Sequence, residues 1–135
     1  MIKNINHVAV VVSDLDESRR FWEDALGLKL AKTERVAEQA VDIAFLPVGE
    51  SEVELLRPFT EDSGVAKYLE KRGPGMHHIC FEVTDITAVL SRLRDHEIPL
   101  IDEQPRTGSD GTQYAFVHPK GTGGVLVELY QLPEA

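Results

Sequence analysis

The sequence predicts an α+β fold of two βαβββ modules in tandem, whose strands form one curved, trough-like mixed sheet. The first observation is a repeat, in which Asn6-His7-Val8-Ala9-Val10 matches His77-His78-Ile79-Cys80-Phe81 at an offset of 78 − 7 = 71 residues. Two later segment pairs match in the same order, namely 44–45 with 115–116 and 53–55 with 127–129. The second observation is that strand-like and helix-like hydrophobic patterns alternate within each half.

The elements of the two modules follow one plan. Each module opens with a β-branched or aromatic run, which predicts strands over 6–12 and 77–83. An apolar stripe with helical spacing then predicts a helix, over about 15–26 and 86–93, with Gly27 as a C-cap. The N-cap candidates are Ser13 or Asp14 and Thr84 or Asp85. Three short strands complete each module, over 28–35, 40–48 and 52–58, and over 99–105, 112–118 and 124–131.

These elements predict a single domain over residues 1–135. Module one spans about 4–60, a linking helix spans about 61–75, and module two spans about 76–132.

Composition narrows the class of protein. Fourteen basic and 23 acidic residues give a net charge of −9, which argues against nucleic acid or anionic membrane as a partner. Cys80 is the single cysteine, so there is no internal disulfide framework and a reducing compartment is favoured. No apolar run approaches the ~18 residues of a membrane span, and the N-terminus does not resemble a signal peptide. We therefore expect a cytoplasmic protein.

Alternation along the strands collects four polar side chains on one sheet face. His7 and His78 point away from the face that packs on each helix, and so do Glu54 and Glu128. Two imidazoles and two carboxylates suit a divalent first-row metal. The alternatives are that each histidine is a buried polar residue satisfied by the backbone, or that His–Glu ion pairs fill the trough.

Other candidates rest on weaker patterns. Asp42 is two and four residues from Ala44 and Leu46, so its side chain has the same strand parity, meaning that it points to the same face of the strand. This makes it a candidate second carboxylate in the trough. The alternative is a solvated aspartate at the end of a strand. Lys120 lies in the glycine-rich segment 119–124, which is either an anion cradle or an ordinary hairpin loop. Cys80 and His77 are interpreted as packing residues.

These residues resemble the vicinal oxygen chelate (glyoxalase-like) superfamily, and within it the methylmalonyl-CoA epimerase family. The resemblance covers nearly the whole chain, and its specific stretches include Glu52-Val53-Glu54-Leu55-Leu56 and Gly75-Met76-His77-His78-Ile79. The most specific are the segment 65–73, just before Gly75-Met76-His77-His78, and the run from His118-Pro119-Lys120 to Glu128-Leu129. It implies an isomerase that removes and returns the α-proton of methylmalonyl-CoA through an enolate.

The resemblance also implies a site. The metal ligands would be His7, Glu54, His78 and Glu128, the acid–base pair would be Glu128 and Asp42, and the substrate contacts would be Lys120, Gly121 and Gln113. Co²⁺ is the metal expected in vitro, with Mn²⁺, Ni²⁺ or Zn²⁺ as alternatives. The substrate would be an acyl-CoA, and the oligomer a homodimer.

Three other functions remain open at this point. A lactoylglutathione lyase would use a similar ligand set on a glutathione hemithioacetal. An extradiol dioxygenase would need two histidines and one glutamate, which leaves Glu54 surplus. A metal-free binding protein of the same fold would not need the four ligands.

Overall fold

The structure, a computed structural model, describes residues 1–134 and divides into two compact units. One unit is Val8–His77, and the other combines Met1–His7 with the chain from His78 onward. The boundaries fall inside strands β1 (Ile2–Val11) and β5 (Gly75–Val83), so each unit contains part of both strands. Residues 4–7, which the sequence places at the start of module one, therefore belong with the unit that contains most of module two.

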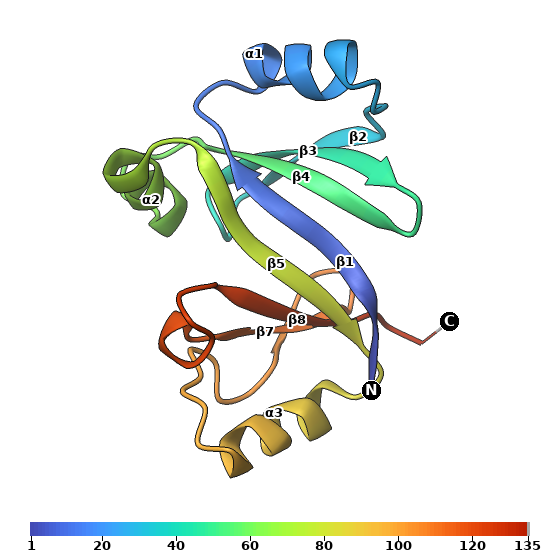
Figure 1. Cartoon of the computed structure of the whole chain (residues 1–135), viewed down its shortest axis with the longest axis vertical. Helices are drawn as coiled ribbons and strands as arrows, with labels where there is room; N and C mark the ends of the chain where they lie inside the picture. The colour runs from blue at the N-terminus through green and yellow to red at the C-terminus, as the bar shows by residue number, and fades with distance from the viewer. Residues whose placement is uncertain (135) are drawn as a thin grey trace. The chain divides into compact units, whose positions relative to one another are not determined.

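The Val8–His77 unit has the predicted order of elements. Its helical segment begins as α1 (Leu15–Arg19) and continues as a π-helix, η1 (Arg20–Ala25). Strands β2 (Lys32–Val36), β3 (Val41–Val48) and β4 (Ser51–Pro58) follow, and then α2 (Gly64–Arg72). The strands are hydrogen-bonded in the order β2-β3-β4-β1, and Figure 1 shows α1 against β3 and β4. Asp14 is the N-cap, and Gly27 has the positive φ expected of a C-cap.

The two faces of this sheet carry separate apolar clusters. On one face Val12, Ala44, Leu46 and Leu55 pack with Leu15 and Trp22 from the helical segment. On the other face Ala9, Val11, Ile43 and Leu56 pack with Tyr68 and Leu69 of α2. The predicted alternation along β1 and β4 is therefore confirmed, because odd and even positions separate cleanly between the clusters.

The other unit repeats the plan with a parallel pair in the middle. Its elements are α3 (Ile86–Asp95), β6 (Arg106–Thr107), β7 (Gln113–Val117), a 3₁₀ turn η2 (Pro119–Gly121) and β8 (Val127–Gln131). The strand order is β1-β5-β8-β7-β6, with β5 and β8 parallel. α3 starts at the N-cap Asp85 and packs through Ile86, Val89 and Leu90 on Ala115, Val117 and Leu129.

The predicted strand over 99–105 is largely wrong. Only Leu100 forms an isolated bridge, to Val117, and the short β6 begins later, at Arg106. The physical reason is the buried carboxylate of Asp102, whose Oδ2 accepts the Phe116 backbone N–H at 2.9 Å. A side chain thus takes the place of a backbone acceptor along β7, which interrupts a regular ladder.

Among the described residues, no helix has both the length and the apolar character needed to cross a membrane.

Candidate metal centre

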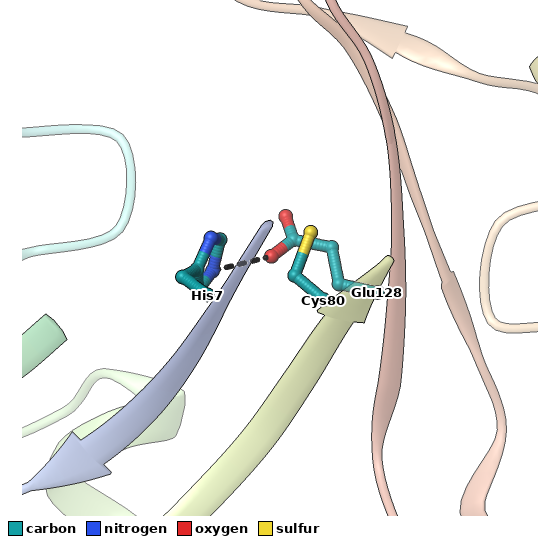
Figure 2. A group of neighbouring side chains, drawn as sticks. All are labelled: His7, Cys80 and Glu128. Carbon is teal, nitrogen blue, oxygen red and sulfur yellow. Dashed lines mark ion pairs between the residues drawn. The ribbon is translucent and has the colours of Figure 1, made fainter. Parts of the chain in front are cut away.

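Three side chains from adjacent strands meet in the unit that contains His78. His7 comes from β1, His78 from β5 and Glu128 from β8, and all three are buried. Glu128 Oε1 lies 3.3 Å from His7 Nε2 and 3.1 Å from His78 Nε2. The two Nε2 atoms lie 3.2 Å apart. Figure 2 shows the His7–Glu128 contact, with Cys80 alongside.

The spacing of these three atoms fits a shared cation. Two ligands each about 2.1 Å from one ion, at angles between octahedral and tetrahedral values, lie about 3.0–3.4 Å apart. The observed separations of 3.1, 3.2 and 3.3 Å fall within that range. Two imidazole nitrogens and a carboxylate oxygen are also ligands that first-row divalent ions accept. The predicted convergence of His7, His78 and Glu128 is confirmed, and the donor set fits a divalent metal.

The charge of Glu128 is stabilised by the two histidines. Burial alone would raise the pKa of this carboxyl, but hydrogen bonds with His7 and His78 outweigh burial and lower its pKa from 4.5 to about 2. Glu128 is therefore an anion at neutral pH. That charge is needed in a ligand that neutralises part of a divalent ion.

Aromatic rings and one thiol surround the three ligands. The ring of His7 makes an edge contact with Tyr130 at 5.6 Å between centroids, and His78 makes one with Phe116 at 5.6 Å. Cys80 pairs with Glu128 in the β5–β8 register, and its Sγ lies within 4.8 Å of ligand atoms of His7 and Glu128. The expected orientation of Cys80 toward this face is confirmed.

Glu54 lies in the other unit and is buried. It pairs with Phe45 across the β3–β4 ladder, and it shares strand parity with Leu56 in the cluster of Ala9 and Val11. It is the one buried carboxylate among the described residues of the Val8–His77 unit. Its predicted role as a fourth ligand stays a prediction.

The expectation that Asp42 shares the face of Glu54 is wrong. Asp42 does have the parity of Ala44 and Leu46, but those residues lie in the cluster beneath α1, on the opposite face from Glu54. Its carboxylate makes two hydrogen bonds to Arg35, at 2.8 and 3.1 Å, which lower the pKa of Asp42. Arg57 lies across the ladder at 3.6 Å. Asp42 is thus part of a surface ion-pair group.

Gln113 lies on the opposite sheet face from Glu128, and its expected role as a substrate contact stays a prediction. It pairs with Gln131 and shares parity with Ala115 and Val117, which pack on α3. Glu128 pairs instead with Phe116, so Gln113 and Glu128 lie on opposite faces of the sheet.

The segment 119–124 is a compact turn whose amides are mostly occupied. Lys120 N–H donates to His118 Nδ1, and the N–H groups of residues 121, 122 and 124 donate to backbone carbonyls within the loop. The interpretation as a cradle of free backbone amides is therefore not supported. What the loop offers an anion is the exposed Lys120 side chain. Gly121 has a packing role, because a Cβ there would lie 2.7 Å from Ile98 Cγ2.

His77 behaves as expected for a packing residue. Its ring makes an edge contact with Tyr68 at 4.9 Å between centroids, within the Val8–His77 unit.

Comparison with known proteins identifies the family. The profile of the Glyoxalase/Bleomycin resistance protein/Dioxygenase superfamily matches residues 6–116. The chain belongs to this superfamily. Human mitochondrial methylmalonyl-CoA epimerase, a relative, is 39% identical over 128 residues, which is 94% of this chain and 73% of the relative. An ethylmalonyl-CoA/methylmalonyl-CoA epimerase of Cereibacter sphaeroides is 36% identical over 134 residues, 98% of this chain and all of the relative.

Solved structures of methylmalonyl-CoA epimerases are similar over nearly the whole chain. The methylmalonyl-CoA epimerase of Mycobacterium tuberculosis superposes with a TM-score of 0.89 at 35% identity, covering 98% of this chain and 90% of the other. The structure of a methylmalonyl-CoA epimerase in complex with methylmalonyl-CoA and NH4+ also superposes with a TM-score of 0.89, at 36% identity. The match covers 98% of this chain and 96% of the other. The predicted fold class and the resemblance to the epimerases are confirmed.

Proposed function

We propose that this protein is a methylmalonyl-CoA epimerase, which interconverts (2R)- and (2S)-methylmalonyl-CoA by removing and returning the α-proton. The observation that carries the proposal is the convergence of His7, His78 and Glu128 at metal-ligand spacing. It occurs in a chain that is 36–39% identical to named epimerases over most of its length.

The residues of the centre divide the chemistry between them. A divalent metal, when bound, supplies a Lewis acid for the oxyanion that forms on the thioester when the α-proton leaves. His7 and His78 would hold it through neutral Nε2 atoms, and Glu128 through an anionic oxygen. Glu54 is proposed as the fourth ligand, supported by its burial and its charge.

Inversion also requires proton transfer on both faces of the α-carbon. Glu128 is the proposed acid–base group on one side. A carboxylate with a pKa of about 2 is a weak base, since general bases work best with a pKa near the operating pH. Asp42 is no longer supported as the second group, because it lies on the opposite sheet face from Glu54 and pairs with Arg35.

The acyl-CoA substrate carries phosphates, whereas the chain has a net charge of −9. Local cations must therefore attract it. Lys120, which is exposed on the turn after β7, is the proposed contact, and Gly121 keeps that turn packed on Ile98. Arg106 is less available, because its Nε and Nη2 bind the Asp102 carboxylate at 2.9 and 2.7 Å.

The decisive test is proton NMR of methylmalonyl-CoA in heavy water, with purified protein and Co²⁺, against a chelator control. We expect metal-dependent loss of the α-proton signal. His78→Ala should abolish both exchange and metal binding. His77→Ala is the matched control, since its ring contacts Tyr68 instead, and it should leave both intact.

An unchanged α-proton signal, with metal binding shown separately by calorimetry, would refute the epimerase proposal. The methylglyoxal–glutathione adduct would then be tested, because turnover of that hemithioacetal would indicate a lactoylglutathione lyase.

Three finer points remain predictions. The metal is expected to be Co²⁺ in vitro, and elemental analysis of the protein as purified tests it against Mn²⁺, Ni²⁺ and Zn²⁺. The homodimer is tested by light scattering on the eluted protein. The cytoplasmic location is tested by cell fractionation.

A further inference from the structure

His7 uses both of its ring nitrogens. Nε2 points to His78 and Glu128, while Nδ1 lies 2.8 Å from Oδ1 of its neighbour Asn6. A neutral histidine has one protonated and one unprotonated nitrogen. If Nδ1 carries the proton and donates it to Asn6, the lone pair is on Nε2, where a metal needs it. The orientation of the Asn6 amide therefore decides whether His7 is ready to bind.

Glu82 sets that orientation. The Nδ2 group of Asn6 lies 3.5 Å from Glu82 Oε1, and Glu82 Oε2 pairs with Lys3 Nζ at 3.1 Å. An ionised carboxylate only accepts hydrogen bonds, so it selects the NH₂ end of the amide and leaves Oδ1 facing His7. Glu82 is 9% exposed, which strengthens its contacts relative to water. All four residues belong to the unit that holds His78 and Glu128.

We propose that Asn6 is a positioning residue that holds His7 in its Nδ1–H tautomer, and that Glu82, paired with Lys3, fixes the amide of Asn6. The proposal rests on the metal centre described above. Outer partners of this kind commonly change metal affinity by 10–100-fold when they are removed. The sequence signal is the Asn-His pair at the start of β1, which is absent from the second repeat, where His77 precedes His78.

The test uses two variants of similar size. Asn6→Leu removes the acceptor, and Asn6→Asp keeps a carboxylate oxygen in its place. Calorimetric titration of metal-free protein with Co²⁺ should show affinity falling roughly 10–100-fold for Asn6→Leu and largely retained for Asn6→Asp. Glu82→Ala should give a smaller loss, because Asn6 remains but its amide is free to rotate.

A second readout does not need metal or substrate. Long-range ¹H–¹⁵N NMR of the histidine rings, above the ordinary histidine pKa of about 6.5, reports which ring nitrogen carries the proton. Nδ1 of His7 should carry a proton in the wild type and in Asn6→Asp, because an oxygen acceptor faces it in both. In Asn6→Leu that acceptor is gone while Glu128 Oε1 still accepts from Nε2, so the fraction of His7 with a proton on Nδ1 should fall. Near-ultraviolet circular dichroism of each variant checks that it is folded.

The outcomes separate this inference from the proposed function. Wild-type tautomer and affinity in a folded Asn6→Leu protein would overturn it. If Asn6→Leu does not fold, the same two measurements are made on Glu82→Ala. A wild-type His7 tautomer and a wild-type Co²⁺ affinity in that variant would overturn the proposed role of Glu82. A failed proton-exchange assay would leave both measurements unaffected.

Discussion

Acidification should destabilise the metal-free protein through Glu128. The folded-state pKa of this carboxyl is about 2, below the ordinary value of 4.5. A group with a lowered folded pKa stabilises the fold above its unfolded pKa and loses that contribution as the pH falls toward the folded value. The difference of about 2.5 pKa units corresponds to a contribution of about 3 kcal/mol to the free energy of unfolding. About 2 kcal/mol of that contribution would be lost between pH 6 and pH 3.

The assay compares two proteins by urea unfolding at several pH values, with a chelator present. The wild type contains the titrating group, and Glu128→Gln replaces it with a neutral side chain of the same size. The difference in free energy of unfolding between the two should change by about 2 kcal/mol between pH 6 and pH 3. Parallel curves would show that Glu128 does not titrate abnormally, and would refute the inferred histidine contacts.

Three further substitutions follow from the corrected positions. Asp42→Asn should leave the proton-exchange rate within about twofold, and a large rate loss in the NMR assay would contradict this. It should change the free energy of unfolding by less than ~0.5 kcal/mol, because the ion pair with Arg35 is exposed. Gly121→Ala should cost about 1–3 kcal/mol in urea unfolding, because the added Cβ meets Ile98; wild-type stability would mean that the turn shifts easily. Asp102→Ala should cost about 1–3 kcal/mol, since a buried backbone N–H loses its acceptor, and an unchanged melting curve would count against that role.

The convergence of His7, His78 and Glu128 was predictable from the sequence. His7 and His78 occupy equivalent repeat positions, and alternation along β8 places Glu128 toward the same side as the aromatic Tyr130. Within residues 7–12, 78–81 and 126–129 a single polar side chain stands among apolar neighbours, so alternation along each stretch identifies the face that it occupies.

The errors arose where both faces of a strand are apolar. Along β3, Ile43 and Ala44 are both buried, in different clusters, so the pattern does not reveal which face α1 covers. Asp42 was assigned to the wrong side for that reason. The missing strand before β6 has another cause. Backbone hydrogen bonds join residues 99–102 to residues 116–118, but the Phe116 N–H donates to the Asp102 side chain instead of a backbone carbonyl, and hydrophobic periodicity does not reveal this.

The division of β1 between the two units has a consequence for folding order. Residues 1–7 leave the ribosome before nearly all of the chain, yet their unit is completed by β8, which follows every other strand in the sequence. Contacts so far apart in sequence carry a loop-closure cost and form slowly. The Val8–His77 unit, whose strands are contiguous, has no such delay. The ligand cluster of His7, His78 and Glu128 should therefore be among the last parts of the molecule to assemble, and nascent chains that end before Glu128 should have no site at which to capture a metal.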